Sequence, residues 1–103
     1  MTARARLPNR RLAETFDLEV AGLKYTASVG RFSDGRVGEV FLQNHKPGSQ
    51  SDFNARDAAV TASLALQHGC PLDVLRRALL RDPRGKASTP LGIALDIIAE
   101  DRR

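Results

Sequence analysis

The sequence is short of the residues on which many catalytic and metal sites depend. Its 103 residues include one cysteine, Cys70, two histidines, one tyrosine and no tryptophan. A single thiol cannot close a disulfide within the chain, so the cysteine usage does not favour secretion. Structural zinc sites take four ligands, often in paired short spacings, and one cysteine with two separated histidines does not supply them. We therefore expect no metal, no cofactor and no catalytic residue.

Long apolar runs are also absent. No stretch approaches the roughly 20 apolar residues that span a bilayer. The basic residues near the N-terminus are not followed by the apolar segment of a signal peptide. The sequence therefore predicts a cytoplasmic protein with no membrane partner, built as one folded domain over 13–99 between a basic flexible arm, 1–12, and a charged tail, 100–103.

The first half of that domain has the alternation of β-strands. Apolar residues recur at every second position in 14–20, 23–29 and 37–42, which is the period of half-buried strands. Ala21-Gly22 and Ser33-Asp34-Gly35 separate these segments with residues that favour tight turns. Short turns between successive strands predict a three-stranded antiparallel meander with one face covered by helices.

The second half has the pattern of helices. Ser51 or Asp52 is a suitable N-cap for a long helix that runs to about His68 and is rich in alanine. A short helix follows, with leucines at three- and four-residue spacing. Thr89 can cap a last helix whose first residue is Pro90. The fold class is therefore α+β, with the meander packed against one long helix and two shorter C-terminal helices.

Cys70 lies at the join between the long helix and the short one. Gly69 can end a helix and Pro71 can begin the next, so the three residues predict a tight corner with a thiol at its apex. A nucleophilic cysteine needs a base and an oxyanion site, and nearness of His68 in sequence does not provide them. We interpret Cys70 as a buried packing residue, and an enzyme that uses its thiol as the least favoured function.

Basic residues gather in two clusters, and the formal net charge is +4. Such clusters are either solvated surface or contact sites for phosphates and acidic surfaces. They give an alternative function, nucleic-acid binding through Arg4, Arg6, Arg10, Arg11, Arg76 and Arg77. Few aromatic residues are present, which argues against base stacking on single strands. The second cluster also contains Arg81, Arg84 and Lys86.

The loop before the long helix is a candidate anion or partner site. Gly48 and Ser49 precede the helix, and the free N–H groups of a helix N-terminus attract anions. Asp57 either pairs with a basic side chain of the sheet or loop, or faces solvent. The candidate ligand-binding residues are Arg31, His45, Lys46, Ser49 and Asp57.

Several segments in a fixed order resemble the TSCPD-domain family, named for a Thr-Ser-Cys-Pro-Asp motif. The domain also occurs near the C-terminus of adenosylcobalamin-dependent ribonucleotide reductases. Where the motif stands, this chain has His-Gly-Cys-Pro-Leu-Asp at 68–73. The resemblance covers nearly the whole chain and rests on 6–11, 25–29, 38–42, 56–59, 65–69, 78–79 and 85–92.

The resemblance implies a non-catalytic accessory or binding module of ribonucleotide-reductase type, and it supplies no catalytic residues. The module would act through protein contacts, with a reductase subunit as one candidate partner and a nucleotide or other anion as a candidate ligand. A homodimer is a further expectation, because a small domain with a helix that is apolar on most faces buries more surface against a copy of itself.

Overall fold

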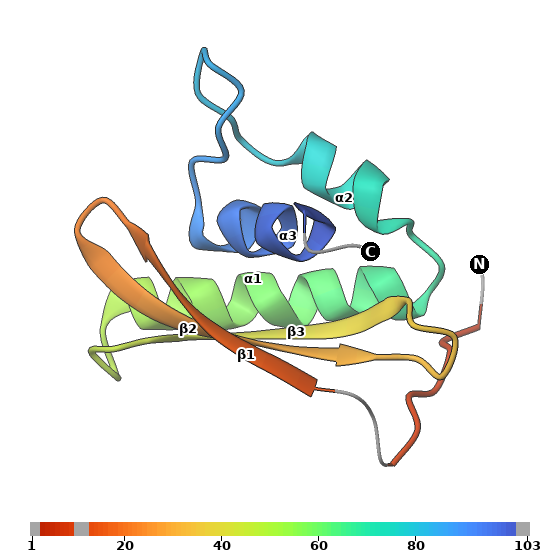
Figure 1. The fold of residues 1–103 in the computed structure, drawn as a ribbon. Helices are drawn as coiled ribbons and strands as arrows, with labels where there is room; N and C mark the ends of the chain where they lie inside the picture. Colours follow the sequence, from red (N-terminus) through yellow and green to blue (C-terminus); the bar gives the residue numbers. More distant parts are fainter. Residues whose placement is uncertain (1–2, 10–12, 101–103) are drawn as a thin grey trace.

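The computed structural model describes residues 3–9 and 13–100, which form one antiparallel sheet and the helices that cover it (Figure 1). The strand order is β1-β2-β3. The elements are β1 (Ala13–Val20), β2 (Leu23–Arg31), β3 (Val37–Asn44), α1 (Gln50–Gln67), α2 (Leu72–Ala78) and α3 (Pro90–Glu100). The predicted α+β meander, followed by one long and two shorter helices, is confirmed.

One face of the sheet forms half of the core. The pairing register sets Leu18 of β1 opposite Tyr25 of β2, and Ala27 of β2 opposite Leu42 of β3. Because side chains alternate along a strand, these residues share one face, and each of them is buried. The other face is mostly polar, although Phe41 lies on it with 53% of its surface exposed.

Both predicted turns are present. Ala21 and Gly22 have φ angles of 51° and 80°, so both central residues of the first hairpin are left-handed, as in the two-residue turns that match strand twist. In the second turn, Gly35 has a φ of 92° and its N–H donates to the carbonyl of Phe32 at 2.9 Å. The second turn returns the chain so that β3 runs antiparallel to β2.

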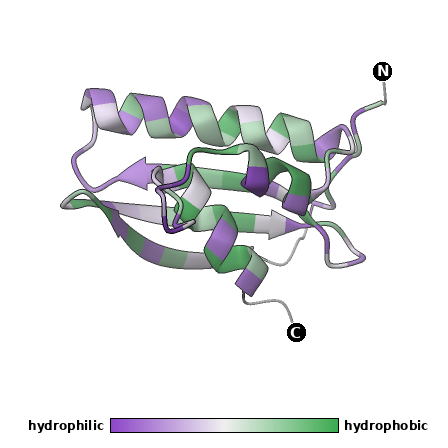
Figure 2. Ribbon diagram, turned by 90° about the horizontal axis from the view of Figure 1, so that it is seen from above, coloured by the Kyte–Doolittle hydropathy of each residue, from purple (hydrophilic) through white to green (hydrophobic). Residues whose placement is uncertain are grey.

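The helices cover the apolar face side by side. α1 lies along β3, α3 contacts β1, and α2 packs on the outer side of α3 (Figure 1). Figure 2 shows α1 beside the sheet, with hydrophilic residues prevailing in its first half. Its buried alanines, Ala55, Ala59 and Ala62, are at most 5% exposed and let the helix approach the core closely. No helix in the described part of the chain is long and apolar enough to cross a membrane.

Helix α1 begins two or three residues earlier than the sequence predicted, because its N-cap is not Ser51 or Asp52. Ser49 is the N-cap, and its Oγ accepts a hydrogen bond from the N–H of Asp52 at 3.1 Å. The prediction of Ser51 or Asp52 as the cap is therefore wrong. The N-cap of α3 is the one that the sequence predicted. Thr89 Oγ1 accepts a hydrogen bond from the N–H of Gly92 at 3.1 Å, and α3 starts at Pro90.

Polar side chains of α1 seal the outer edge of β3. Gln67 Nε2 donates to the carbonyl of Gly38 at 2.9 Å, and Asp52 Oδ1 accepts from the N–H of Asn44 at 3.0 Å. Between them, Ser63 bonds the backbone of Val40. Unpaired backbone groups at a sheet edge usually remain open to water or to another strand. Here a helix takes the place of that strand.

Part of the N-terminal arm lies against the end of α1, near the N label in Figure 1. The N–H of Ala5 donates to the carbonyl of Gln67 at 2.7 Å, and the Arg4 guanidinium contacts the Gln67 side chain. Arg6 is exposed. Arg10 and Arg11, which the sequence assigned to the same arm, lie outside the described residues.

Candidate functional site

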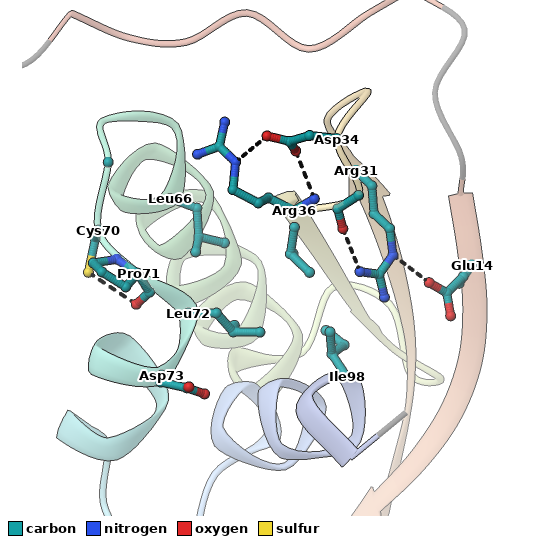
Figure 3. Close-up of a pocket in the computed structure, with 13 residues that line it drawn as sticks. Glu14, Arg31, Asp34, Arg36, Leu66, Cys70, Pro71, Leu72, Asp73 and Ile98 are labelled. Carbon is teal, nitrogen blue, oxygen red and sulfur yellow. Dashed lines mark hydrogen bonds and ion pairs between the residues drawn. The ribbon is translucent and has the colours of Figure 1, made fainter. Parts of the chain in front are cut away.

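A groove of about 990 Å³ opens where the C-terminal end of α1, the start of α2, the end of α3 and the β2–β3 turn come together. Leu66, Leu72 and Ile98 point into it from three helices, and Cys70 lies at one end (Figure 3). Its volume is at the upper end of the range of about 300–1,000 Å³ for small-molecule sites. Its lining combines these apolar side chains with charged residues, which include Glu14, Arg31 and Arg36.

The predicted corner builds one wall of this groove. Gly69 has a φ of 100°. Its N–H donates to the carbonyl of Leu66 at 3.2 Å, and the N–H of Cys70 donates to the carbonyl of Ala65 at 2.9 Å. These two bonds are the Schellman pattern of a helix C-terminus. His68 caps α1, since its Nδ1 donates to the carbonyl of Leu64 at 2.8 Å.

Cys70 is half-buried, not fully buried as the sequence suggested, and it lies at the edge of the groove. Its Sγ donates to the carbonyl of Pro71 at 3.7 Å. The nearby imidazole of His68 uses Nδ1 as a donor to α1. His45 contacts Thr26 at the other end of β2, with 2.9 Å between Nε2 and Oγ1. Among the described residues, the hydrogen bond of the thiol goes to Pro71 and to neither histidine.

Two ion pairs form the opposite rim of the groove. Arg31 Nε donates to Glu14 Oε1 at 2.8 Å, and Arg36 Nε donates to Asp34 Oδ2 at 2.7 Å (Figure 3). The backbone N–H of Arg36, followed by its guanidinium, holds the pKa of Asp34 below its ordinary value. Arg36 also lies over the ring of Phe32, 4.9 Å from its centroid. The rim therefore has both positive and negative charges, and these four charged side chains are paired with one another.

The structure separates the residues predicted to form an anion site. His45, Lys46 and Ser49 lie together in the loop between β3 and α1. Arg31 is at the far end of β2, where it lines the groove. Asp57 is exposed on α1, which is the second of the two positions considered for it.

Asp52 was missed as a site residue, and it dominates this loop. Its carboxylate accepts from the N–H groups of Asn44 and Gly48 at 3.0 and 3.2 Å and from Arg56 Nε at 3.0 Å. Burial disfavours the charged carboxylate, but these donors outweigh burial and keep the pKa of Asp52 below its ordinary value. Two backbone donors of this loop, the N–H groups of Asn44 and Gly48, are therefore already used by Asp52. Nδ2 of Asn44 is buried and has no partner among the described residues.

The second arginine cluster is partly structural. Arg81 donates to both oxygens of Asp96 at 2.7 and 2.8 Å, and Arg76 donates to Asp96 and Asp73 at 3.1 Å each. Hydrogen bonds from Arg81 contribute most to holding the pKa of Asp96 below its ordinary value. These contacts tie α2 and the following loop to α3. Arg77 remains exposed, as do Arg84 and Lys86.

The described residues do not form a metal site. Among residues 3–9 and 13–100, no group of three or more His, Cys, Asp and Glu side chains is arranged to hold a metal ion.

Comparison with known proteins shows that this chain is similar in sequence to a short segment of a large enzyme. No family model matches the chain, and no solved structure matches it. The vitamin B12-dependent ribonucleotide reductase of Agrobacterium fabrum is 41% identical over 70 residues, which are 68% of this chain and 6% of that protein. The reductase of the same name from Bradyrhizobium diazoefficiens is 38% identical over 73 residues, or 71% of this chain and 6% of that protein.

A third relative extends the match beyond these two organisms. The vitamin B12-dependent ribonucleotide reductase of Rhodopirellula baltica is 36% identical over 72 residues, which are 70% of this chain and 7% of the reductase. This chain thus spans only a small fraction of the length of these relatives. It is a homologue of a short segment of vitamin B12-dependent ribonucleotide reductases, and the resemblance to the TSCPD domain associated with such enzymes is confirmed.

Proposed function

We propose that this protein is a non-catalytic accessory module of ribonucleotide-reductase type that acts through protein contacts. The observation that carries the proposal is the homology itself: about 70% of this chain matches a segment that makes up only 6% of a reductase. The contacts of Cys70 support the non-catalytic role, because its Sγ donates to the Pro71 carbonyl and bonds to neither histidine among the described residues. Nucleophilic catalysis by a thiol needs a base.

The groove is the surface that we assign to the protein contact. Its apolar side chains come from α1, α2 and α3, and its rim charges are matched within the domain. A polyanion such as a nucleotide would have to compete with Glu14 for Arg31 and with Asp34 for Arg36. A polypeptide segment that places apolar side chains in the groove does not need Arg31 or Arg36 and so does not compete with Glu14 or Asp34 for them. The geometry therefore favours a segment of a reductase subunit over a nucleotide in this groove.

Anion binding at the loop before α1 stays a prediction. Lys46 and His45 are exposed there, and Asn44 Nδ2 lacks an acceptor among the described residues. Asp52 already accepts from the backbone N–H groups of the loop. An anion at this site would have to compete with Asp52 for the N–H groups of Asn44 and Gly48. We therefore expect weak binding of nucleotide, which native mass spectrometry of the purified protein would check.

Nucleic-acid binding remains the second candidate, because the net charge is +4 and Arg6 and Arg77 are exposed. Arg76, by contrast, is bound to Asp73 and Asp96. Such binding would weaken steeply with salt, since counterion release sets the affinity. DNA or RNA binding that is absent or insensitive to salt would remove this candidate.

Co-purification with a vitamin B12-dependent reductase subunit tests the main proposal. Leu72 lines the groove, whereas Val74 of the same helix is 59% exposed. We expect the unmodified chain and Val74→Glu to retain the subunit and Leu72→Glu to lose it. Circular dichroism confirms that each variant is folded. Failure of the unmodified chain to retain the subunit contradicts the proposal, and equal retention by both variants contradicts the assignment of the groove.

A further inference from the structure

The solvent-facing side of α1 has an apolar stripe that the groove does not use. Phe53, Val60 and Leu64 are 51%, 53% and 41% exposed. At 3.6 residues per turn, these positions fall on one narrow face of the helix. Asp57 occupies the same face, between Phe53 and Val60. Exposed apolar residues that are scattered singly are normal, but several gathered on one face of a helix indicate a contact surface.

A shallow cavity adjoins this stripe. It measures about 220 Å³ and lies between β3 and α1, where Phe41, Arg56 and Val60 line it. Phe41 is itself 53% exposed. The surface therefore has both a projecting aromatic ring, Phe53, and a hollow in which an apolar side chain can be placed.

The charges on this surface are adjacent and of opposite sign. The carboxylate of Asp57 has no partner among the described residues, and Thr61 bonds the backbone carbonyl of Asp57 and not its side chain. Arg56 uses Nε for Asp52, and its side chain is 50% exposed, so its terminal nitrogens are available to a further acceptor. Burying either charge without a partner would be costly.

We propose that this face binds a second copy of the chain, with the two α1 helices antiparallel across a two-fold axis between Arg56 and Asp57. That axis sets Arg56 of each copy opposite the partner's Asp57. It also sets Phe53 opposite the partner's Val60, because each stands three residues from the central pair. Phe53 of one copy then reaches the hollow beside the partner's Val60, and the contact is isologous.

The charge pattern selects a second copy over other occupants. A two-fold axis matches both Arg56 and Asp57 without any further group, whereas a partner of one charge sign would leave one of them buried and unmatched. The proposed dimer does not rest on the groove, which lies at the C-terminal end of α1. Groove and stripe can therefore be tested with separate variants.

Light scattering on the full chain tests the dimer. We expect a mass of about twice 11.2 kDa. Val60→Glu places a carboxylate in the apolar contact, and Asp57→Arg sets arginine against the partner's Arg56. Each should raise the dissociation constant at least about tenfold, as for central interface residues. Val74→Glu, the same change at an exposed valine of α2, should leave the dimer unaffected, and circular dichroism checks that all variants fold.

Three results would overturn this inference. One is a mass of 11.2 kDa at every concentration tested. Another is a dimer that persists unchanged in Val60→Glu and Asp57→Arg, which would place the contact elsewhere. The third is a monomer whose stripe binds a reductase subunit in a Val60-dependent manner. Leu72→Glu should lose reductase binding while the dimer stays intact. The groove and the stripe can therefore fail or succeed independently of each other.

Discussion

The hydroxyl of Ser63 bonds both backbone groups of Val40. Its Oγ accepts from the N–H of Val40 at 2.9 Å and donates to the carbonyl of the same residue at 3.0 Å. Ser63 is 8% exposed and Val40 is fully buried. A hydroxyl can serve both groups because it is at once a donor and an acceptor. This pair fixes where α1 lies along β3.

Ser63→Ala should destabilise the domain more than its small change in size suggests. The variant leaves the N–H and carbonyl of Val40 buried without a partner, at a cost of about 1–3 kcal/mol. Urea unfolding measures the change. Thr61→Ala is the control, because Thr61 is exposed and bonds only within α1, and it should stay within about 0.5 kcal/mol. Equal effects of the two substitutions would show that the edge contact contributes nothing.

Leu95 of α3 should be among the most sensitive core positions. Its side chain is fully buried in a core with many alanines. Leu95→Ala removes apolar burial and leaves a cavity, so we expect a loss of about 2–5 kcal/mol in the free energy of unfolding. Leu80→Ala at a residue that is 73% exposed is the matched control, with an expected change of at most about 0.5 kcal/mol. A small effect at Leu95 would contradict the position of α3 over the sheet.

Gly69 should tolerate substitution in the order that its backbone conformation dictates. With a φ of 100°, it occupies a region that side chains rarely adopt. Gly69→Val should cost about 1–2 kcal/mol, from the left-handed strain alone, and Gly69→Asn should cost less, because asparagine enters this region more readily. Thermal unfolding of the two variants provides the comparison. If valine were the better tolerated of the two, the corner at Cys70 would not be built as described.

Asp96 should make stability depend on pH in the acid range. Its pKa is lowered in the folded protein, mainly by Arg81, from the value of 3.8 of the free side chain. Because the folded pKa is the lower one, its contribution is fully present above pH 3.8 and is lost as pH falls through the folded value. The urea midpoint of Asp96→Asn should therefore lie below that of the unmodified chain by a constant amount near neutral pH.

The gap between the two midpoints should then narrow in acid. Glu19→Gln, a change at an exposed residue of β1, serves as the control and should show no such gap at any pH. A gap for Asp96→Asn that stayed constant well below pH 3.8 would mean that the contacts with Arg76 and Arg81 do not stabilise the charged carboxylate.

Local pattern was sufficient to predict every strand and helix of the described chain, because alternation and capping residues depend on near neighbours. The start of α1 shows where that stops. Ser49, Ser51 and Asp52 are all good N-caps by type. The choice among them depends on the burial of Asp52 beneath Asn44 and Gly48, which is a tertiary contact. A single sequence does not reveal which carboxylate will be buried.

The site was harder to predict for the same reason. Arg31 was grouped with Lys46, although the register of the β2–β3 hairpin sets Arg31 against Val37 at the opposite end of the sheet. The Asp-Gly turn at 34–35 implies this register, and therefore implies that Arg31 lies far from Lys46. Asp96 has a different signal, because it is an acid in the middle of a helix whose neighbouring residues, 91–95 and 97–99, are apolar or glycine. Its partners, Arg76 and Arg81, stand 20 and 15 residues away in sequence and were interpreted as a free basic cluster.

Sealing of β3 by α1 has a consequence for how this module can be joined to other polypeptides. Within the described sheet, β1 is left as the only strand with a free edge. If a second copy adds its own β1 beside Ala13–Val20, the joined sheet ends on each side at a β3 that is covered by α1. Sheet extension through β1 would therefore stop at one pair of copies, so the geometry resists runaway fibre growth.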